Sequence, residues 1–485
     1  MNRATLALTI AVLALAAAAG AQQDKGVSSK TVQRLNRAPV NRDNLQVKLP
    51  RPTETKLSNG LTILLLERHK LPTVNFELWV NTGSLDDPKD LPGLAKFTAE
   101  MLREGTAHRT SSQVSSEIDT LGSTLGADVD FGATYTQITA SGFSENANKV
   151  LDLLSDVILN PSFPADELDK YKRRQTAELD EQRSDPSFLS QERLYLALYG
   201  NSPAAVIAPT AASIQAVSSG QLKQFHDAHY LPNNSVLGIA GDFDSKQMTA
   251  LVQKYFGNWK QQAYSAKPPT VPALGSKRII LVDRPDSVQT NIILGELAVP
   301  RNDPDYFGLR VMDHVLGGGT AARLFLNLRE DKGYTYGAYS SFSPDTYPRP
   351  LLANTEVRTA VTDGSIHELL GELNRLREQP VPAAELDDAR RAIVASFALS
   401  LERPTSLLNR FMELKHNQLP WDYWDKYPAE IAKIGPEVIQ RVSKKYYDPN
   451  HLQIVCVGNA KEIKDVLAKY GPVEVYDVDG KKVTP

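Results

Sequence analysis

The sequence has one cysteine and lacks the short motifs of several common enzyme classes. Cys456 is the single cysteine among 485 residues, so no disulfide can form within the chain. Because it stands in the apolar run LQIVCVGN, we expect a buried thiol with a structural role. No Gly-x-Ser-x-Gly elbow occurs, and the Gly317–Gly319 run lacks the rest of a phosphate-binding loop. These absences exclude the familiar serine hydrolase and nucleotide-binding patterns.

An excess of either charge is also missing. The 54 Lys and Arg residues and 57 Asp and Glu residues are interspersed and give a net charge of −3. This composition argues against nucleic acid or an anionic membrane as a partner. One long apolar run occurs, at residues 1–21; it has an Arg near its start and ends in Ala-Gly-Ala. That pattern is typical of a secretory signal peptide, so we predict a periplasmic or extracellular protein without a membrane span in the mature chain.

The rest of the chain divides into two large parts. Residues 22–50 are polar and contain prolines, and we interpret them as an N-terminal extension. Pro, Ala, Gly and Ser replace periodic sequence at 261–277, which predicts a linker. The expected domains are therefore 51–260 and 278–475.

The two parts resemble each other. GLAKFTAEMLREGT at 93–106 matches FGLRVMDHVLGGGT at 307–320, and paired apolar strands precede both. Such a long repeat predicts an α+β fold of two duplicated domains, each with a mostly antiparallel sheet covered by helices. Alternating apolar and polar residues at 127–142 predict one half-buried strand, with Val129, Phe131, Ala133 and Tyr135 on one face.

The helix predicted at 93–106 carries the most informative positions. Its apolar stripe leaves Lys96 and Glu100, four residues apart, on a neighbouring face. With the preceding strand pair and the turn before Pro92, this passage resembles the M16 (pitrilysin or insulinase-type) zinc peptidases. In that family the helix bears His-x-x-Glu-His; here Lys96, Ala99 and Glu100 replace the first His, the Glu and the second His. The resemblance implies two halves closing like a clam shell.

The replacements remove the chemistry of the motif. Two imidazoles bind Zn²⁺ and the carboxylate takes a proton from its water, whereas a protonated lysine cannot ligate and an alanine cannot act as a base. The family's third ligand, a Glu, falls by ungapped spacing near Tyr171, within 171–181, with Glu178 and Glu181 close by. We expect no metal in this chain, and we hypothesise that the Lys96 ammonium takes the place of the cation and pairs with Glu100. An exposed helix pair is the alternative interpretation.

The second half of the chain matches the corresponding half of the family. GGGTAARLFLNLREDKGYTYGAYSSF, from Gly317, resembles the family's C-terminal signature, in which an Arg and a Tyr hold the scissile peptide at the zinc site of the other half. Arg329 and Tyr336 match that pair, and both side chains can stabilise an oxyanion. The alternative is structural, with Arg329 bound to Glu330 and Tyr336 in the core.

Three functions remain open at this stage. The resemblance favours a subunit without zinc that joins a His-x-x-Glu-His chain as a heterodimer, binds peptide and supplies Arg329 and Tyr336 in trans; zinc is then expected in the partner. A scaffold without catalysis is the second. The third is a self-sufficient metallopeptidase with unusual ligands such as Glu100, Glu178 and histidines from elsewhere. His226 and His229, three residues apart, are a further but weak metal pair.

Overall fold

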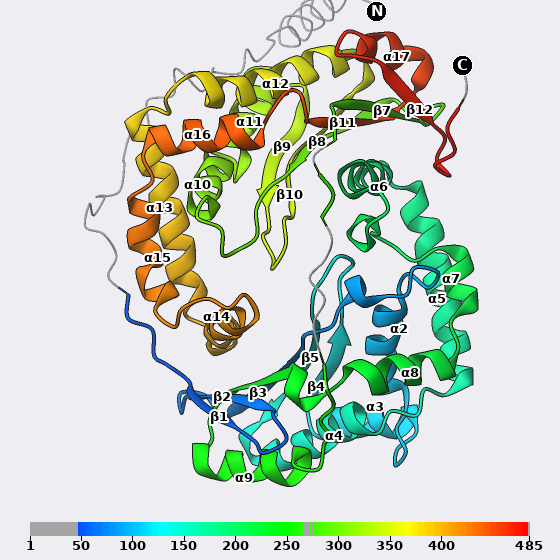
Figure 1. Cartoon of the computed structure of the whole chain (residues 1–485), viewed down its shortest axis with the longest axis vertical. Helices are drawn as coiled ribbons and strands as arrows, with labels where there is room; N and C mark the ends of the chain where they lie inside the picture. The colour runs from blue at the N-terminus through cyan, green and yellow to red at the C-terminus, as the bar shows by residue number, and fades with distance from the viewer. Residues whose placement is uncertain (1–46, 265–270, 274, 484–485) are drawn as a thin grey trace, which may run out of the picture.

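A computed structural model describes residues 47–264, 271–273 and 275–483. The predicted signal peptide, most of the predicted extension and part of the predicted linker lie outside these residues. In the described ranges the chain forms two sheets, each of six strands, which occupy opposite ends of the molecule (Figure 1). None of the helices described there is long and apolar enough to cross a bilayer.

The first sheet comes from the N-terminal half. Its strands are β1 (Thr53–Lys56), β2 (Thr62–Glu67), β3 (Thr73–Val80), β4 (Thr124–Asp128), β5 (Thr136–Phe143) and β6 (Ser235–Gly241). They lie in the order β1-β2-β6-β3-β5-β4, and all pairs are antiparallel except β2 with β6. Their apolar residues alternate in direction: Ile63 and Leu65 face one buried cluster, whereas Leu64 and Leu66 face another. Both faces of this sheet are therefore covered.

The second sheet repeats this arrangement. Its strands are β7 (Arg278–Asp283), β8 (Gln289–Leu297), β9 (Thr335–Phe342), β10 (Pro350–Arg358), β11 (Gln453–Gly458) and β12 (Val473–Tyr476), in the order β12-β7-β11-β8-β10-β9. β7 runs parallel to β11 and β12, and the other pairs are antiparallel. Cys456 lies in the central strand β11 and is buried, as expected, and this burial raises the pKa of its thiol to about 12.

Helices follow the strands in each half. The N-terminal half has α2 (Leu94–Met101), α3 (Ser111–Thr120), α4 (Ala147–Leu159), α5 (Ala165–Ser184), α6 (Pro186–Tyr199), α7 (Ala211–Ala216), α8 (Ser219–His229) and α9 (Ser245–Phe256). The C-terminal half has α10 (Tyr306–Gly317), α11 (Arg323–Phe325), α12 (Thr362–Glu378), α13 (Ala383–Ser400), α14 (Pro404–His416), α15 (Tyr423–Ala432), α16 (Pro436–Tyr446) and α17 (Ala460–Ala468). The helices α2 and α10 occupy the two copies of the repeat, which confirms the duplicated α+β fold.

One helix of each half packs on the sheet of the other half. Leu194 and Leu198 of α6 pack on Ile280 and Val455 of the second sheet. In return, α14 lies over the first sheet, where Leu408 and Met412 approach Gly238 so closely that a Cβ there would come within 3 Å of both side chains. Figure 1 shows α6 beneath β8 and β11, and α14 above β2 and β3. Burying each leucine of this kind contributes about 1.5–3 kcal/mol, so the exchange ties the halves together.

The predicted single strand at 127–142 is wrong. The chain forms β4 up to Asp128, turns through residues 129–135, and returns as β5 from Thr136. Gly132 in this turn has a φ of 75°, a value that glycine adopts without strain. The alternating pattern continues through the turn, and the turn rather than a strand face carries Phe131, Ala133 and Tyr135 toward the other half.

Candidate functional site

Helix α2 is fixed at its start by a half-buried carboxylate. Asp87 accepts hydrogen bonds from the backbone N–H groups of Gly93 and Ala95, both at 2.7 Å, which satisfies donors that a helix leaves unpaired. Burial raises the pKa of Asp87 to about 7, against the opposing effect of these two bonds. Leu94, Phe97 and Met101 are buried, so the helix cannot rotate and Lys96 is held toward the interior between the sheets.

Lys96 is the centre of a small charged group. Its Nζ lies 2.7 Å from Oδ1 of Asp128 and 3.9 Å from Oε1 of Glu100, and its side chain is 20% exposed. Burial alone would lower the pKa of Lys96, but the hydrogen bond to Asp128 and the nearby carboxylates raise it above its usual value. Burial raises the pKa of Glu100, and the Lys96 charge opposes that rise. The predicted pairing with Glu100 is present as a long contact, and Asp128 is the closer partner.

These residues do not fit a zinc ion. A lysine that stays protonated has no lone pair to donate, and Ala99 is fully buried without a polar atom. The described part of the chain contains no group of three or more His, Cys, Asp or Glu side chains placed to hold a metal. A cation of the protein itself therefore stands where the metal motif would have placed one.

The predicted third-ligand segment lies on α5. Tyr171 is buried edge-on against Phe97, with ring centroids 4.8 Å apart, so the ungapped position belongs to the core. Glu181 is exposed, whereas Gln175 and Glu178 line a cavity of about 360 Å³ together with Lys96. Gln175 Nε2 donates to Glu178 Oε2 at 2.8 Å. Within 171–181, Leu179 lines the cavity as well, so Gln175 and Glu178 are the polar side chains of this segment that share it with Lys96.

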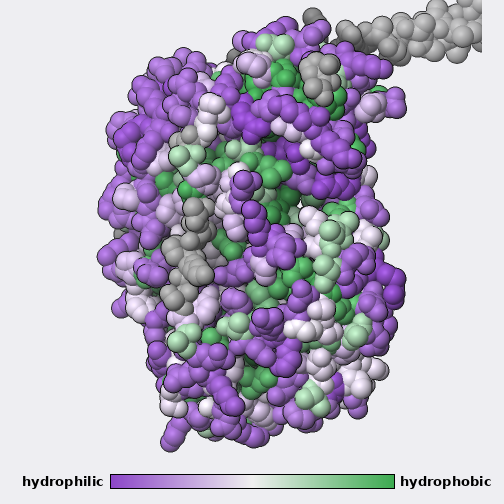
Figure 2. Space-filling view, turned by 45° about the vertical axis from the view of Figure 1, so that its right-hand side comes forward, coloured by the Kyte–Doolittle hydropathy of each residue, from purple (hydrophilic) through white to green (hydrophobic). Residues whose placement is uncertain are grey.

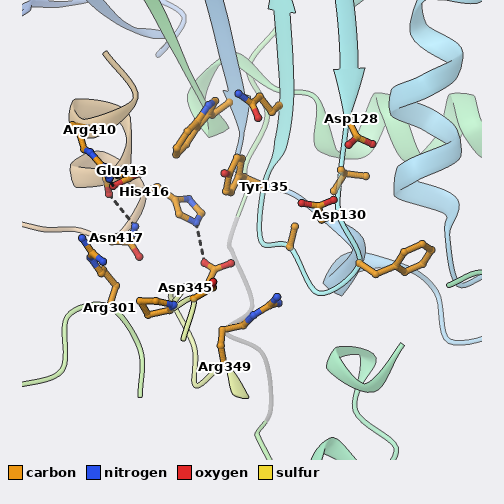
Figure 3. A pocket seen from close by; sticks show the side chains of 17 residues that line it. Asp128, Asp130, Tyr135, Arg301, Asp345, Arg349, Arg410, Glu413, His416 and Asn417 are labelled. Atoms are coloured by element: carbon orange, nitrogen blue, oxygen red, sulfur yellow. Dashed lines mark hydrogen bonds and ion pairs between the residues drawn. The ribbon is translucent and has the colours of Figure 1, made fainter. Parts of the chain in front are cut away.

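A second cavity of about 310 Å³ adjoins the first, and both include Asp130, Phe131 and Arg349 in their walls. Its walls come from the β4–β5 turn, the β9–β10 loop and the end of α14, as Figure 3 shows. Figure 2 shows hydrophilic residues over most of one face of the molecule. Together the two cavities form a polar chamber between the halves, which we call the central chamber.

Hydrogen bonds join the halves at the wall of the central chamber. The carbonyl of Gly132 accepts from the Tyr347 hydroxyl at 2.7 Å and from Arg349 Nη1 at 2.8 Å. Beside it, Thr134 Oγ1 donates to Asp345 Oδ1 at 2.7 Å. His416 Nε2, of the same half as Asp345, lies 3.3 Å from that oxygen (Figure 3). We call the hydrogen bonds of Gly132 and Thr134 the latch, because they connect the β4–β5 turn of one half to the β9–β10 loop of the other.

Arg329 and Tyr336 lie on the surface of the C-terminal half and not in the walls of the two cavities of the central chamber. Arg329 is 46% exposed and follows α11 in a short π-helix (Leu326–Asp331), and Tyr336 is 91% exposed on the edge strand β9. The alternative that Tyr336 is a core residue is therefore wrong. Arg329 Nε does lie 3.7 Å from Glu330, and its guanidinium stacks 4.7 Å above the Phe325 ring. Most of the Tyr336 side chain and a little under half of the Arg329 side chain are left for contact with another molecule.

His226 and His229, which the sequence suggested as a weak metal-binding pair, have other contacts. His226 is buried, its Nε2 lies 2.8 Å from the Ile158 carbonyl oxygen, and burial lowers its pKa. His229 Nδ1 lies 3.3 Å from Thr82 Oγ1. The two imidazoles thus bind separate neighbours, and α8 serves as a packed helix.

Sequence analysis missed several residues of the central chamber. Asp128 is 32 positions from Lys96, and Asp345 and Arg349 follow a strand of the other half. The one available signal was the acidic pair Asp128 and Asp130 beside Gly132, which is typical of a turn rather than a strand.

Comparison with protein families gives two adjoining matches. A model described as insulinase, peptidase family M16, matches residues 62–209, and a model described as the peptidase M16 inactive domain matches residues 216–393. An uncharacterised zinc protease of Bacillus subtilis is 26% identical over 356 residues, which are 73% of this chain and 85% of that protein. One from Mycobacterium leprae is 27% identical over 290 residues, 59% of this chain, and the match spans 65% of the relative, less than two thirds of its length.

Solved structures agree with these matches. A peptidase M16 inactive domain from Pseudomonas fluorescens is 26% identical, with a TM-score of 0.78 over 84% of this chain and 98% of that one. The periplasmic protease PqqL from Escherichia coli is 18% identical, with a TM-score of 0.72 over 90% of this chain and 52% of that one. The second likeness shows the fold alone.

Proposed function

Because the chain belongs to the M16 peptidase family, we propose that it is the subunit of a two-chain peptidase that carries no zinc of its own. In this proposal a second M16 chain with an intact His-x-x-Glu-His motif supplies the metal. The present chain completes the chamber, binds an extended peptide and contributes Arg329 and Tyr336 in trans. We place the pair of chains in the periplasm, since residues 1–21 have the pattern of a signal peptide and PqqL is described as periplasmic.

The observation that carries the proposal is the replacement of the metal position by an ion pair. Lys96 satisfies Asp128 and Glu100 without a metal, and Ala99 removes the general base. Meanwhile Arg329 and Tyr336 remain exposed on the second half. A guanidinium and a phenol can hydrogen-bond a peptide carbonyl and stabilise its oxyanion without ionising. The chain thus has the substrate-binding part of the chemistry and lacks the metal-dependent part.

Two other functions are supported less well. A self-sufficient metallopeptidase needs at least three ligands in one place, and no such cluster exists in the residues that the structure describes. A scaffold without catalysis needs no exposed Arg and Tyr, and it predicts that their replacement leaves the partner's activity unchanged.

The proposal is tested by reconstitution. The mature chain is purified alone and also with each His-x-x-Glu-His M16 chain of its own organism, and zinc content and hydrolysis of quenched fluorescent peptides are measured. We expect no hydrolysis and no bound zinc for the chain alone, and zinc-dependent hydrolysis for one mixture above the rate of that partner alone. Stoichiometric zinc in the isolated chain, or no mixture with enhanced activity, would contradict the proposal.

A further inference from the structure

A third cavity, of about 260 Å³, lies within the C-terminal half and is unusual in its charge. Three arginines line it: Arg301 before α10, Arg310 on α10 and Arg410 on α14. Aromatic rings, among them Phe397 and Trp424, form its walls, and no acidic side chain is part of its lining. We call it the arginine cavity. It adjoins the central chamber, since Arg301, Ser343, Pro344 and Arg410 line both.

The three guanidinium groups differ in their distance from the nearest carboxylate. Arg410 lies 3.2 Å from Glu413, and Arg310 lies 3.7 Å from Asp313, a long ion pair. Among the described residues Arg301 has no carboxylate within ion-pair distance, and the charge of Glu413, which lines the central chamber with it, acts on it from farther away. Arg301 donates to the Tyr306 hydroxyl and lies against aromatic rings. Its guanidinium carbon lies 4.1, 5.5 and 5.0 Å from the ring centroids of Tyr306, Tyr423 and Trp424.

Such a cation attracts an anion. Ring faces stabilise a guanidinium less than a hydrogen-bonded carboxylate does in a partly desolvated site. Arg301 has five N–H donors, and most of them have no acceptor in the described part of the protein. A carboxylate is planar, matches the guanidinium fork with two parallel hydrogen bonds, and is small enough for this cavity.

We infer that the arginine cavity binds a carboxylate of the peptide held in the central chamber, so that this chain selects peptides that place a free carboxylate there. The inference rests on the proposed function in that it takes a peptide as the ligand. The carboxylate has two possible sources, an Asp or Glu side chain and the peptide's own C-terminus. In both cases the Arg301 fork binds the two oxygens, Arg310 and Arg410 add positive charge, and the aromatic walls pack on the attached carbon chain.

The test uses the isolated full chain and needs neither the partner nor catalysis. N-acetyl-glutamic acid amide is titrated against N-acetyl-glutamine amide for the side-chain source, and N-acetyl-alanine against N-acetyl-alanine amide for the C-terminal source. Inorganic phosphate serves as a third anion. Trp424 in the cavity wall provides a fluorescence readout, and its Phe variant shows which part of the signal comes from this tryptophan.

We expect at least one carboxylate probe to bind about tenfold or more tightly than its neutral amide, because a charge-assisted bidentate pair is lost in the amide. Arg301→Gln is expected to remove that difference, and Arg310→Gln to reduce it. Arg391→Gln, on the exposed face of α13 and paired with Asp388, removes the same charge outside the cavity and leaves it unchanged. Thermal unfolding shows that each variant is folded.

The inference is overturned if acids and amides bind equally, if phosphate alone binds, or if folded Arg310→Gln and Arg391→Gln behave alike. These results are independent of reconstitution. Selective carboxylate binding without any active partner would contradict the two-chain peptidase and support the carboxylate site. An active partner without selective binding would support the two-chain peptidase and contradict the carboxylate site.

Discussion

The ammonium of Lys96 lies 2.7 Å from the carboxylate of Asp128, at the position where the family's motif has its first metal-binding histidine. This ion pair joins α2 to the end of β4 across 32 residues of sequence. It explains how the helix keeps a polar residue facing the central chamber without a metal, since each charged group has a partner of opposite sign.

Removing the Lys96 charge is expected to destabilise the fold in a pH-dependent way. Lys96→Met leaves Asp128 and Glu100 without their shared cation, so the pKa of Glu100, already raised by burial, rises further. A carboxyl that binds its proton more tightly when folded makes stability fall as pH rises. We expect a loss of about 1 kcal/mol near neutral pH and a smaller loss near about pH 5, measured by urea unfolding.

A matched control is Lys170→Met on α5. Lys170 pairs with Glu167 at 2.9 Å at the surface, so its removal is expected to change little at either pH. Equal effects of the two variants would show that the Lys96 pair is an ordinary surface contact.

The half-buried carboxylate of Asp87, which caps α2, is expected to give a second pH dependence. The pKa of Asp87 is about 7 in the folded protein and near 3.8 in the unfolded chain. The folded state therefore holds this proton more tightly, and its contribution falls as pH rises from about 4 to about 7. Asp87→Asn removes the titration, so the stability of the natural chain relative to the variant should decline across this window.

Denaturant unfolding at several pH values measures that difference. Asp90→Asn, at a nearby exposed carboxyl, is the control for removing a negative charge from the surface. A constant difference for Asp87→Asn would contradict the assigned pKa.

The latch is expected to fail when Gly132 receives a side chain. At its φ of 75°, a Cβ would lie 2.5 Å from Arg349 Nη1 and 3.0 Å from the Tyr347 hydroxyl. Gly132→Ala therefore combines backbone strain with a clash between the halves, and we expect a loss of more than about 1 kcal/mol together with a larger radius of gyration. Small-angle X-ray scattering and urea unfolding measure the two effects.

Gly200→Ala is the control, because it introduces backbone strain without a clash between the halves. Gly200 also has a positive φ, 59°, but a Cβ added there would have no described atom within 4 Å outside its own chain neighbours. This variant should lose stability without a change in shape. An unchanged radius of gyration in both variants would mean that the latch does not hold the halves closed.

The fold was largely predictable because its signals are local. The repeat of 93–106 at 307–320 fell on α2 and α10, and the apolar strands followed the period of two. The exchange of α6 and α14 could not be predicted, since an apolar helix face does not specify which of two sheets covers it. The turn at 129–135 was missed for a related reason: contacts with Tyr347 and Arg349 of the other half hold it, and an alternating pattern cannot show them.

The candidate site was predictable in part. Lys96, Ala99 and Glu100 were identifiable by their place in a motif. Asp128 was not, because it lies beside Lys96 only in the folded chain, where β4 is next to α2. The exposure of Tyr336 agrees with the role that the resemblance implies, whereas strand pattern alone does not predict it, because an aromatic residue in a strand is more often buried.

The central claim is that this chain supplies Arg329 and Tyr336 to a zinc site on another chain. The most direct measurement is kcat for peptide hydrolysis by the reconstituted pair with Arg329→Ala or Tyr336→Phe, each in this chain alone. The controls are Arg358→Ala and Tyr339→Phe, which change exposed residues on β10 and β9. The account predicts a fall of about 100-fold or more for the first two, typical of losing an oxyanion donor, with zinc content and pairing intact. Unchanged kcat in both would contradict it and leave the chain a scaffold.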